Sequence, residues 1–364
     1  MSRLLRRYDA PPVPARELTA LSADGARIHV EVHGRDGAPA VVLSHGWTCS
    51  THFWAAQVRD LAADHRVVVY DQRGHGRSPA VGREGYSTDA LADDLEAVLA
   101  ATLEPGERAV LAGHSMGGMT MMAASRRAGL RAHAAAVLLC STGSSRLIDE
   151  SLVVPLRAGA VRTRATRALL GSRAPLGPVT PVSRRILKYG TMGAGSAPER
   201  VETCARIVHA CPRAARVAWG HVLAELDLDA GVRELRVPTA VIAGTEDRLT
   251  PPVHARALAA ALPDCLGVTE LAGMGHMTPV EAPEAVTAKI RELVAAYVPA
   301  GGAGRADGVG GTGRAGGTGG AGGTGGTGGA GGTDSTGGTG GTGGTGGVGR
   351  ADGTDGTAEK EEVA

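Results

Sequence analysis

The chain has 364 residues and a formal net charge of +1, so its charge does not indicate nucleic acid or an anionic membrane as a partner. No apolar run reaches the length of a membrane span, and no cluster of His, Cys, Asp and Glu has the spacing of a metal site. The five cysteines are odd in number and include no C-x-x-C pair, which favours a reduced, cytoplasmic protein.

Composition divides the chain into segments. Of the 56 glycines, 30 lie beyond residue 300, in Gly-Gly-Thr and Gly-Gly-Ala repeats without proline or aromatic residues. Such a segment cannot bury enough apolar surface to offset its ordering entropy, so residues 300–364 are predicted to form a disordered tail. Residues 1–16 are predicted to be an N-terminal arm. The remainder is long enough for one large α/β domain.

Strands alternate with helices in the predicted core, which comprises residues 17–145 and 236–299. The predicted strands are 20–24, 27–32, 41–44, 66–70, 108–112, 135–140, 238–244 and 268–271. The predicted helices are 53–63, 89–102 with Asp89 as N-cap, 116–127, 252–262 and 281–297. The first two strands read as an antiparallel pair joined through Gly25. The alternation that follows predicts right-handed crossovers and a mostly parallel sheet.

Residues 146–235 interrupt this alternation, and they are too many for an ordinary connection. Helical patterns at 202–209 and 213–226 predict an inserted helical cap. Between Arg146 and Arg216 there are 13 basic and 4 acidic residues. A basic rim would attract anionic substrates, whereas solvated helix faces in an arginine-biased chain would have no such role. The second interpretation is favoured. Trp219 and its apolar neighbours could line a pocket or pack the cap onto the sheet.

A sharp turn is predicted at Gly113-His114-Ser115-Met116-Gly117, which follows the apolar run 109–112. Gly113 and Gly117 let a strand and a helix approach closely around a strained serine. The Ser115 hydroxyl would then project at the carboxyl end of a sheet, where open α/β folds place their sites. Ser115 is therefore the candidate nucleophile.

A nucleophilic serine needs a base and an acid that orients the base. Asp247 and His276 each follow a later strand and glycine, and the order Ser, Asp, His suits this scaffold. Glu246 remains an alternative acid, because it lies in the same loop. His45, His75 and His114 flank motifs, and we expect them to be hydrogen-bonding supports.

With His45-Gly46-Trp47 after an early strand, these motifs resemble those of cap-bearing members of the α/β-hydrolase family over residues 20–298. The resemblance implies an α/β-hydrolase fold, a mostly parallel central sheet flanked by helices with an inserted cap. It implies Ser115 as nucleophile, His276 as general base and Asp247 as its acid. It places the oxyanion hole at the backbone N–H groups of Trp47 and Met116. Relatives that open epoxides or remove halides use an aspartate nucleophile, so the serine argues against those activities.

The function predicted is a cofactor-free, metal-independent serine hydrolase. Its substrate would be an ester, lactone or thioester of a small, fairly apolar acid, with water as co-substrate. Perhydrolysis, as in non-haem peroxidases, acyl transfer and carbon–carbon bond hydrolysis remain alternatives. A ligand receptor that keeps the triad, or an interaction protein that uses the tail, would be of another class. Nothing in the sequence indicates the oligomeric state.

Overall fold

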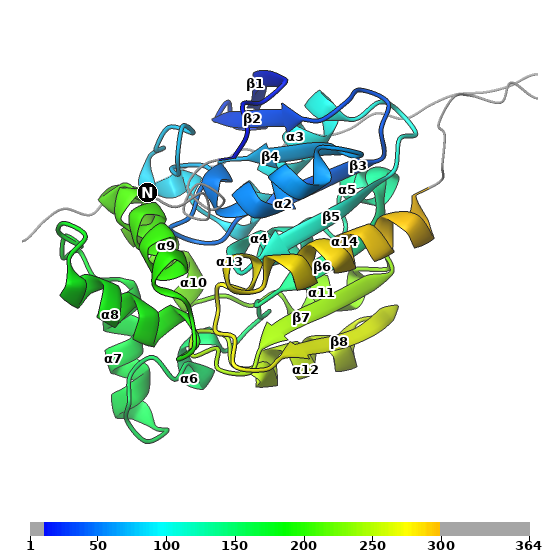
Figure 1. Ribbon diagram of the computed structural model, residues 1–364. Coiled ribbons are helices and arrows are strands. Elements are labelled where there is room, and N and C mark those ends of the chain that lie inside the picture. Colours follow the sequence, from blue (N-terminus) through cyan, green and yellow to red (C-terminus); the bar gives the residue numbers. More distant parts are fainter. Residues whose placement is uncertain (1–10, 299–364) are drawn as a thin grey trace, which may run out of the picture. The chain divides into compact units, whose positions relative to one another are not determined.

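The computed structural model describes residues 11–298 (Figure 1). The predicted tail over 300–364 and most of the predicted arm over 1–16 lie outside these residues. The described part is built on one eight-stranded sheet with the order β1-β2-β4-β3-β5-β6-β7-β8. The strands are β1 (Arg16–Leu21), β2 (Arg27–His33), β3 (Ala40–Ser44), β4 (Arg66–Tyr70), β5 (Ala109–His114), β6 (Ala134–Cys140), β7 (Thr239–Gly244) and β8 (Cys265–Leu271).

The sheet is mostly parallel, as predicted. Strand β1 pairs antiparallel with β2, and β2 pairs antiparallel with β4. Every other pair is parallel. The predicted first strand at 20–24 is wrong in position, because β1 ends at Leu21 and the chain then turns. Ser22 N–H donates to Ala26 O at 2.9 Å, and Gly25 adopts a positive φ of 80° inside this turn.

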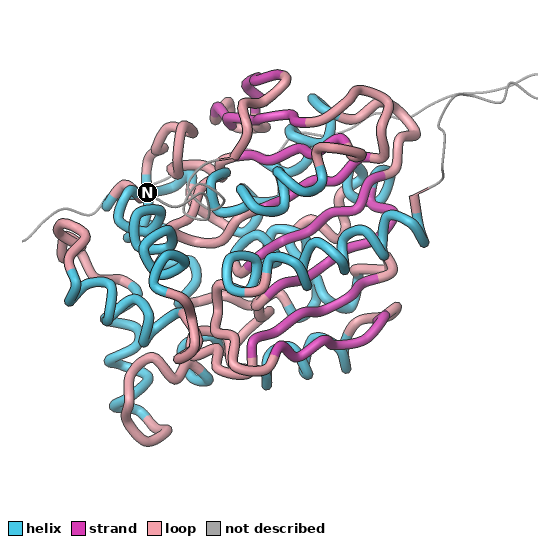
Figure 2. Tube along the Cα trace, viewed as in Figure 1, coloured by secondary structure: helices cyan, strands magenta, loops and turns pink. Residues whose placement is uncertain are grey.

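Helices cover both faces of the sheet (Figures 1 and 2). On one face lie α2 (Ala55–Leu61), which follows the 3-10 turn η1 (Thr51–Trp54), and α14 (Pro283–Tyr297), which follows the short α13 (Thr278–Glu281). On the other face lie α3 (Thr88–Thr102), α4 (Met116–Ala123), α5 (Ala128–His133) and α12 (Pro252–Ala261). Residues of one strand alternate between the two cores: Val41 packs on the α2 side and Val42 on the α3 side. This period of two is the pleat of a strand buried on both faces.

The predicted N-cap of α3 and the predicted end of α4 differ from the structure. The N-cap of α3 is Ser87, whose side chain accepts a hydrogen bond from Ala90 N–H at 3.1 Å. Asp89 lies inside the first turn, where an acidic side chain complements the helix dipole. The predicted helix over 116–127 ends at Ala123, and the chain turns before α5 begins at Ala128.

Between β6 and β7, residues 141–238 form helices and no regular strand. These are α6 (Leu147–Glu150), α7 (Ala160–Leu170), α8 (Pro181–Thr191), α9 (Pro198–Ala210), α10 (Arg213–Ala224) and α11 (Asp229–Glu234). Figure 1 shows α7 to α10 in green beside one end of the sheet. Trp219 on α10 is fully buried. Its indole N–H donates to Arg73 O at 3.1 Å and its ring packs edge-on against Tyr86, so it packs the insertion onto the core.

Candidate active site

Ser115 lies at the turn between β5 and α4, with φ 51° and ψ −117°. A positive φ is strained for a residue with a side chain, and such strain is common at functional sites. The two flanking glycines are required by space. A Cβ on Gly113 would lie 2.3 Å from Gly117 O, and a Cβ on Gly117 would lie 2.1 Å from Ser44 O. The sequence thus builds the sharp turn that the pattern predicted.

Asp247 and His276 meet at the carboxyl ends of β7 and β8. His276 Nδ1 lies 2.8 Å from Asp247 Oδ2, and both residues are buried. Because the carboxylate can only accept, the ring proton is assigned to Nδ1, which leaves Nε2 with a free lone pair. A neutral imidazole held in this tautomer can accept a proton from a hydroxyl.

Asp247 is held by more than the histidine. Its carboxylate also accepts from Leu249 N–H at 2.8 Å, Thr250 N–H at 2.9 Å and the Thr250 hydroxyl at 2.8 Å. Thr250 Oγ1 lies 3.1 Å from His276 Nδ1 as well. Thr250 is therefore a positioning residue that the sequence analysis missed. A threonine three positions after the aspartate was the only signal, and such a signal has little specificity.

Glu246 points away from the histidine. Its carboxylate accepts a hydrogen bond from Ala194 N–H at 2.7 Å, which joins it to the loop between α8 and α9. Its own N–H donates to Met274 O at 2.8 Å. Of the two adjacent carboxylates, Asp247 is the one that contacts the His276 ring.

Ser115 and His276 line the same cavity. Across residues 11–298, no hydrogen bond joins the Ser115 hydroxyl to the His276 ring; such contacts often tighten only when substrate binds. The backbone N–H groups of Trp47 and Met116 likewise donate to no protein acceptor in the described chain. Two unengaged donors beside a serine are what an oxyanion hole requires.

The loop that carries Trp47 is supported by two buried histidines. His75 Nε2 accepts from Thr48 N–H at 3.1 Å, and His45 Nε2 accepts from Gln72 N–H at 3.0 Å. Both rings must be neutral to accept these bonds. Burial lowers the pKa of His45 to about 4. Burial, together with the neighbouring His45, lowers the pKa of His75 to about 3.

His114 supports the other side of the site. Its Nε2–H donates to the backbone oxygen of His276 at 2.8 Å, and the two rings lie 4.9 Å apart. Burial, and next His276, lower its pKa well below the usual range. The expectation that His45, His75 and His114 are hydrogen-bonding supports is confirmed.

Because His45 and His75 are held neutral in the fold, we expect the folded protein to become less stable in acid. An unfolded histidine titrates near ~6.5, whereas His45 and His75 resist protonation in the fold, so the unfolded chain binds more protons between those values. The free energy of unfolding should therefore be greatest above about pH 6.5 and fall as pH drops toward 4. Urea titrations from pH 8 to 5 measure this slope above the range of ordinary carboxylates. His75→Gln should be less stable at pH 7 and show a shallower slope; an unchanged slope would contradict this account.

The cavity at Ser115 has a volume of about 390 Å³ and is largely apolar. Its lining combines core residues, such as Trp47 and Met119, with residues of the insertion. The latter include Leu169, Leu170, Ile186, Leu187, Val208 and Leu223. Of the apolar stripe on α10, Leu223 thus lines the cavity, whereas Trp219 packs against the core.

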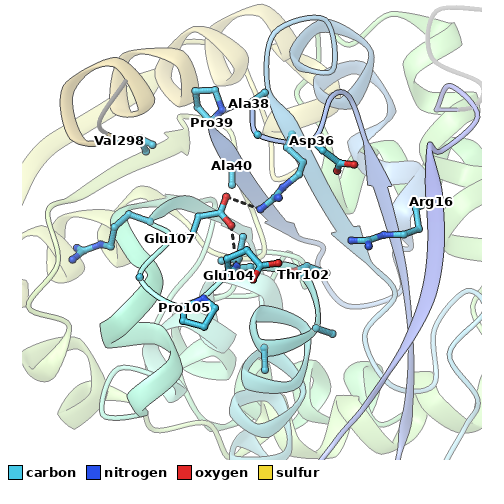
Figure 3. A pocket seen from close by; sticks show the side chains of 17 residues that line it. Arg16, Asp36, Ala38, Pro39, Ala40, Thr102, Glu104, Pro105, Glu107 and Val298 are labelled. Carbon is cyan, nitrogen blue, oxygen red and sulfur yellow. Dashed lines mark hydrogen bonds and ion pairs between the residues drawn. The ribbon is translucent and has the colours of Figure 1, made fainter. Parts of the chain in front are cut away.

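A larger cavity, of about 870 Å³, lies near the amino ends of β3, β4 and β5 (Figure 3). Figure 3 shows Glu107 at its centre, where it accepts from Arg66 at 2.6 Å and from Glu104 N–H at 3.0 Å. None of its lining residues is a serine, cysteine or histidine. The smaller cavity at Ser115 is therefore the candidate active site.

Residues 11–298 contain no group of three or more His, Cys, Asp and Glu side chains arranged to hold a metal ion. They also contain no helix with both the length and the apolar character needed to cross a bilayer.

Comparisons with known proteins agree with this fold. The model of the alpha/beta hydrolase family matches residues 41–289. A protein of Stutzerimonas stutzeri named as a carbamate hydrolase, RutD, is 30% identical over 239 residues, or 65% of this chain and 85% of that protein. The match to RutD of Variovorax paradoxus is 46% identical over 93 residues and covers only 34% of that protein.

Two solved structures are similar over most of the described residues. An esterase from Thermogutta terrifontis has a TM-score of 0.64 and 25% identity, covering 78% of this chain and 100% of that one. The enol-lactonase from Burkholderia xenovorans has a TM-score of 0.62 and 25% identity, covering 76% of this chain and 100% of that one. The chain belongs to the alpha/beta hydrolase family, and it is an α/β-fold hydrolase.

Proposed function

We propose that the protein is a serine hydrolase that cleaves an ester, lactone or thioester of a small, fairly apolar substrate through an acyl-enzyme on Ser115. One observation carries this proposal. Ser115, on a strained turn, lines the same apolar cavity as His276, and His276 Nδ1 is hydrogen-bonded to Asp247. A nucleophile, a base and an orienting acid in one cavity are the requirements of acyl transfer.

In the first step, Ser115 Oγ attacks the acyl carbon and its proton passes to His276 Nε2. Asp247 stabilises the imidazolium that forms, and Thr250 keeps both partners aligned. The negative charge that develops on the substrate oxygen would be met by the N–H groups of Trp47 and Met116. Each such donor is typically worth about 3 kcal/mol in the transition state.

In the second step, His276 returns its proton to the leaving oxygen or sulfur, and the acyl-enzyme forms. A water molecule then attacks the acyl carbon and gives a proton to His276. The bond between the acyl carbon and Ser115 Oγ breaks, and His276 passes that proton to Oγ, so that the acid leaves and Ser115 is restored. We propose that the helical insertion over 146–235 acts as the cap of this site, since its side chains line the cavity that contains Ser115.

The choice of bond is supported by the names of the similar proteins. They are called a carbamate hydrolase, an esterase and an enol-lactonase. The substrates implied by these names share a polarised acyl carbon bonded to a leaving oxygen or nitrogen, which suits attack by a serine.

A fluorophosphonate probe followed by intact-mass analysis tests the proposal, together with turnover of short p-nitrophenyl esters and simple lactones. We expect one probe adduct, located by peptide mapping at Ser115, and hydrolysis of at least one ester that is abolished by prior labelling. Labelling at another serine, or a protein that neither reacts with the probe nor turns over any substrate, would overturn it. The second outcome would favour a ligand receptor.

A further inference from the structure

Arg216 on α10 lines the cavity and is only 6% exposed. Its guanidinium donates to two backbone carbonyls, from Nη1 to Ser172 O at 3.0 Å and from Nη2 to Ala174 O at 2.5 Å. A guanidinium carries five N–H donors, so these two bonds leave donors available. Neither partner carries a negative charge.

The cavity holds no countercharge for this cation. None of its lining residues is an aspartate or glutamate. Arg216 forms no ion pair with any of residues 11–298. Other arginines of the insertion, such as Arg146, Arg167 and Arg184, are far more exposed and do form ion pairs. A buried charge is costly unless it is paired, because the low-dielectric surroundings do not replace its hydration. An unpaired guanidinium retained in an apolar cavity therefore indicates that its partner arrives with a ligand.

Arg216 is also tied to the reaction centre. The indole N–H of Trp47 donates to Arg216 O at 3.0 Å. The backbone N–H of Trp47 is one of the two proposed oxyanion donors, so α10 is attached directly to the residue that would contact the acyl oxygen. An anionic group on Arg216 would lie within the cavity that holds Ser115.

We propose that Arg216 is a specificity residue that binds a carboxylate at the far end of the substrate. The substrate class is then a carboxylate-bearing ester, lactone or thioester with a short apolar segment between its two ends. This inference rests on the proposed function and narrows it. A carboxylate fits better than a compact monovalent anion, because a planar guanidinium can bind both of its oxygens.

Matched substrates test the proposal. Mono-p-nitrophenyl glutarate carries a free carboxylate. Methyl p-nitrophenyl glutarate, in which that carboxylate is a methyl ester, is neutral and of nearly equal size. We expect the wild-type protein to favour the anionic ester by about 10- to 100-fold in kcat/KM, the range expected for a hydrogen bond to a charged group. Both esters share one leaving group, and the enzyme-free rate of each is subtracted because the free carboxylate speeds the spontaneous hydrolysis of the anionic ester; the ratio then reports on the distal carboxylate.

Three variants assign the preference to Arg216. Arg216→Gln should bring the ratio of kcat/KM for the two esters, measured within the same variant, close to one, while Arg216→Lys should keep part of the preference. Arg213→Gln is the matched control, because Arg213 lies on the same helix, is exposed and forms no ion pair with the described chain. It should leave the preference unchanged, whereas a general basic rim would lose preference equally in both variants.

The outcomes separate this inference from the proposed function. Equal hydrolysis of the two esters by the wild type, or a preference that survives Arg216→Gln, would overturn the role of Arg216. Neither result would contradict the proposed hydrolase function. A loss of both activities together with a lowered melting temperature in Arg216→Gln and Arg216→Lys would show that Arg216 is only a structural clamp of residues 172–174. If neither ester is hydrolysed, calorimetry with glutarate still decides: binding that Arg216→Gln abolishes supports the subsite, and no binding overturns it.

Discussion

Replacing Ser115 with alanine is expected to abolish hydrolysis and fluorophosphonate labelling while the fold remains intact. In the proposed mechanism the Ser115 hydroxyl forms the acyl-enzyme, and the members of such a triad act as a unit. The loss in kcat should therefore be large, on the order of 10⁶-fold. Steady-state kinetics and intact-mass analysis measure the loss. Circular dichroism and melting temperature show that the fold is retained.

Ser172→Ala is the matched control for this experiment. Ser172 lines the same cavity but lies in the insertion, and within residues 11–298 its hydroxyl accepts a single hydrogen bond, from Ala174 N–H at 3.2 Å. Its replacement should leave probe labelling intact and change turnover little. Full labelling of Ser115→Ala, or loss of labelling in Ser172→Ala, would place the nucleophile elsewhere.

Asp247→Asn is expected to lower kcat by up to about 10⁴-fold with little change in fold. Asparagine can keep the shape of the side chain, but its amide cannot stabilise the imidazolium of His276 as the carboxylate does. It can also favour the wrong tautomer of His276, since an NH₂ group facing Nδ1 would demand a lone pair there. Measurements of kcat and KM should place the loss in kcat.

Glu246→Gln is the control for Asp247→Asn, because it makes the same chemical change one residue away. Its carboxylate contacts Ala194 N–H and not His276, so turnover should fall by less than about 3-fold. If turnover falls strongly in Glu246→Gln and not in Asp247→Asn, the acid has been assigned to the wrong residue. If neither substitution lowers turnover, Asp247 does not take part in the reaction and the proposed triad is wrong.

The local features of this protein were accessible from sequence, since they depend on residues close together in the chain. Continuous apolar runs predicted the buried strands, since a strand covered on both faces has no polar side. Gly113 and Gly117 predicted the turn at Ser115, since no side chain fits between β5, α4 and β3. The first strand and the N-cap of α3 were misplaced. The turn that ends the first strand is closed by a backbone hydrogen bond from Ser22 to Ala26, and the N-cap of α3 is set by the Ser87 side chain; an apolar pattern reveals neither bond.

Features that depend on distant segments were decided only by the tertiary structure. Two adjacent carboxylates, Asp247 and Glu246, are equivalent in sequence. They differ because the β7 loop turns one toward His276 and the other toward the insertion. Thr250 gained its role in the same way, through a contact with a histidine on another loop.

The basic residues of the insertion show the same limit most clearly. Counting charges could not separate Arg216 from the other arginines, and composition favoured solvated helix faces for all of them. Exposed Arg213 fits that interpretation, whereas Arg216 is buried in the cavity. Whether a charge is solvated, paired or left without a partner depends on what surrounds it in space. Packing decides those surroundings, because Arg216 is hydrogen-bonded both to Trp47 of the core and to Ser172 and Ala174 of the insertion.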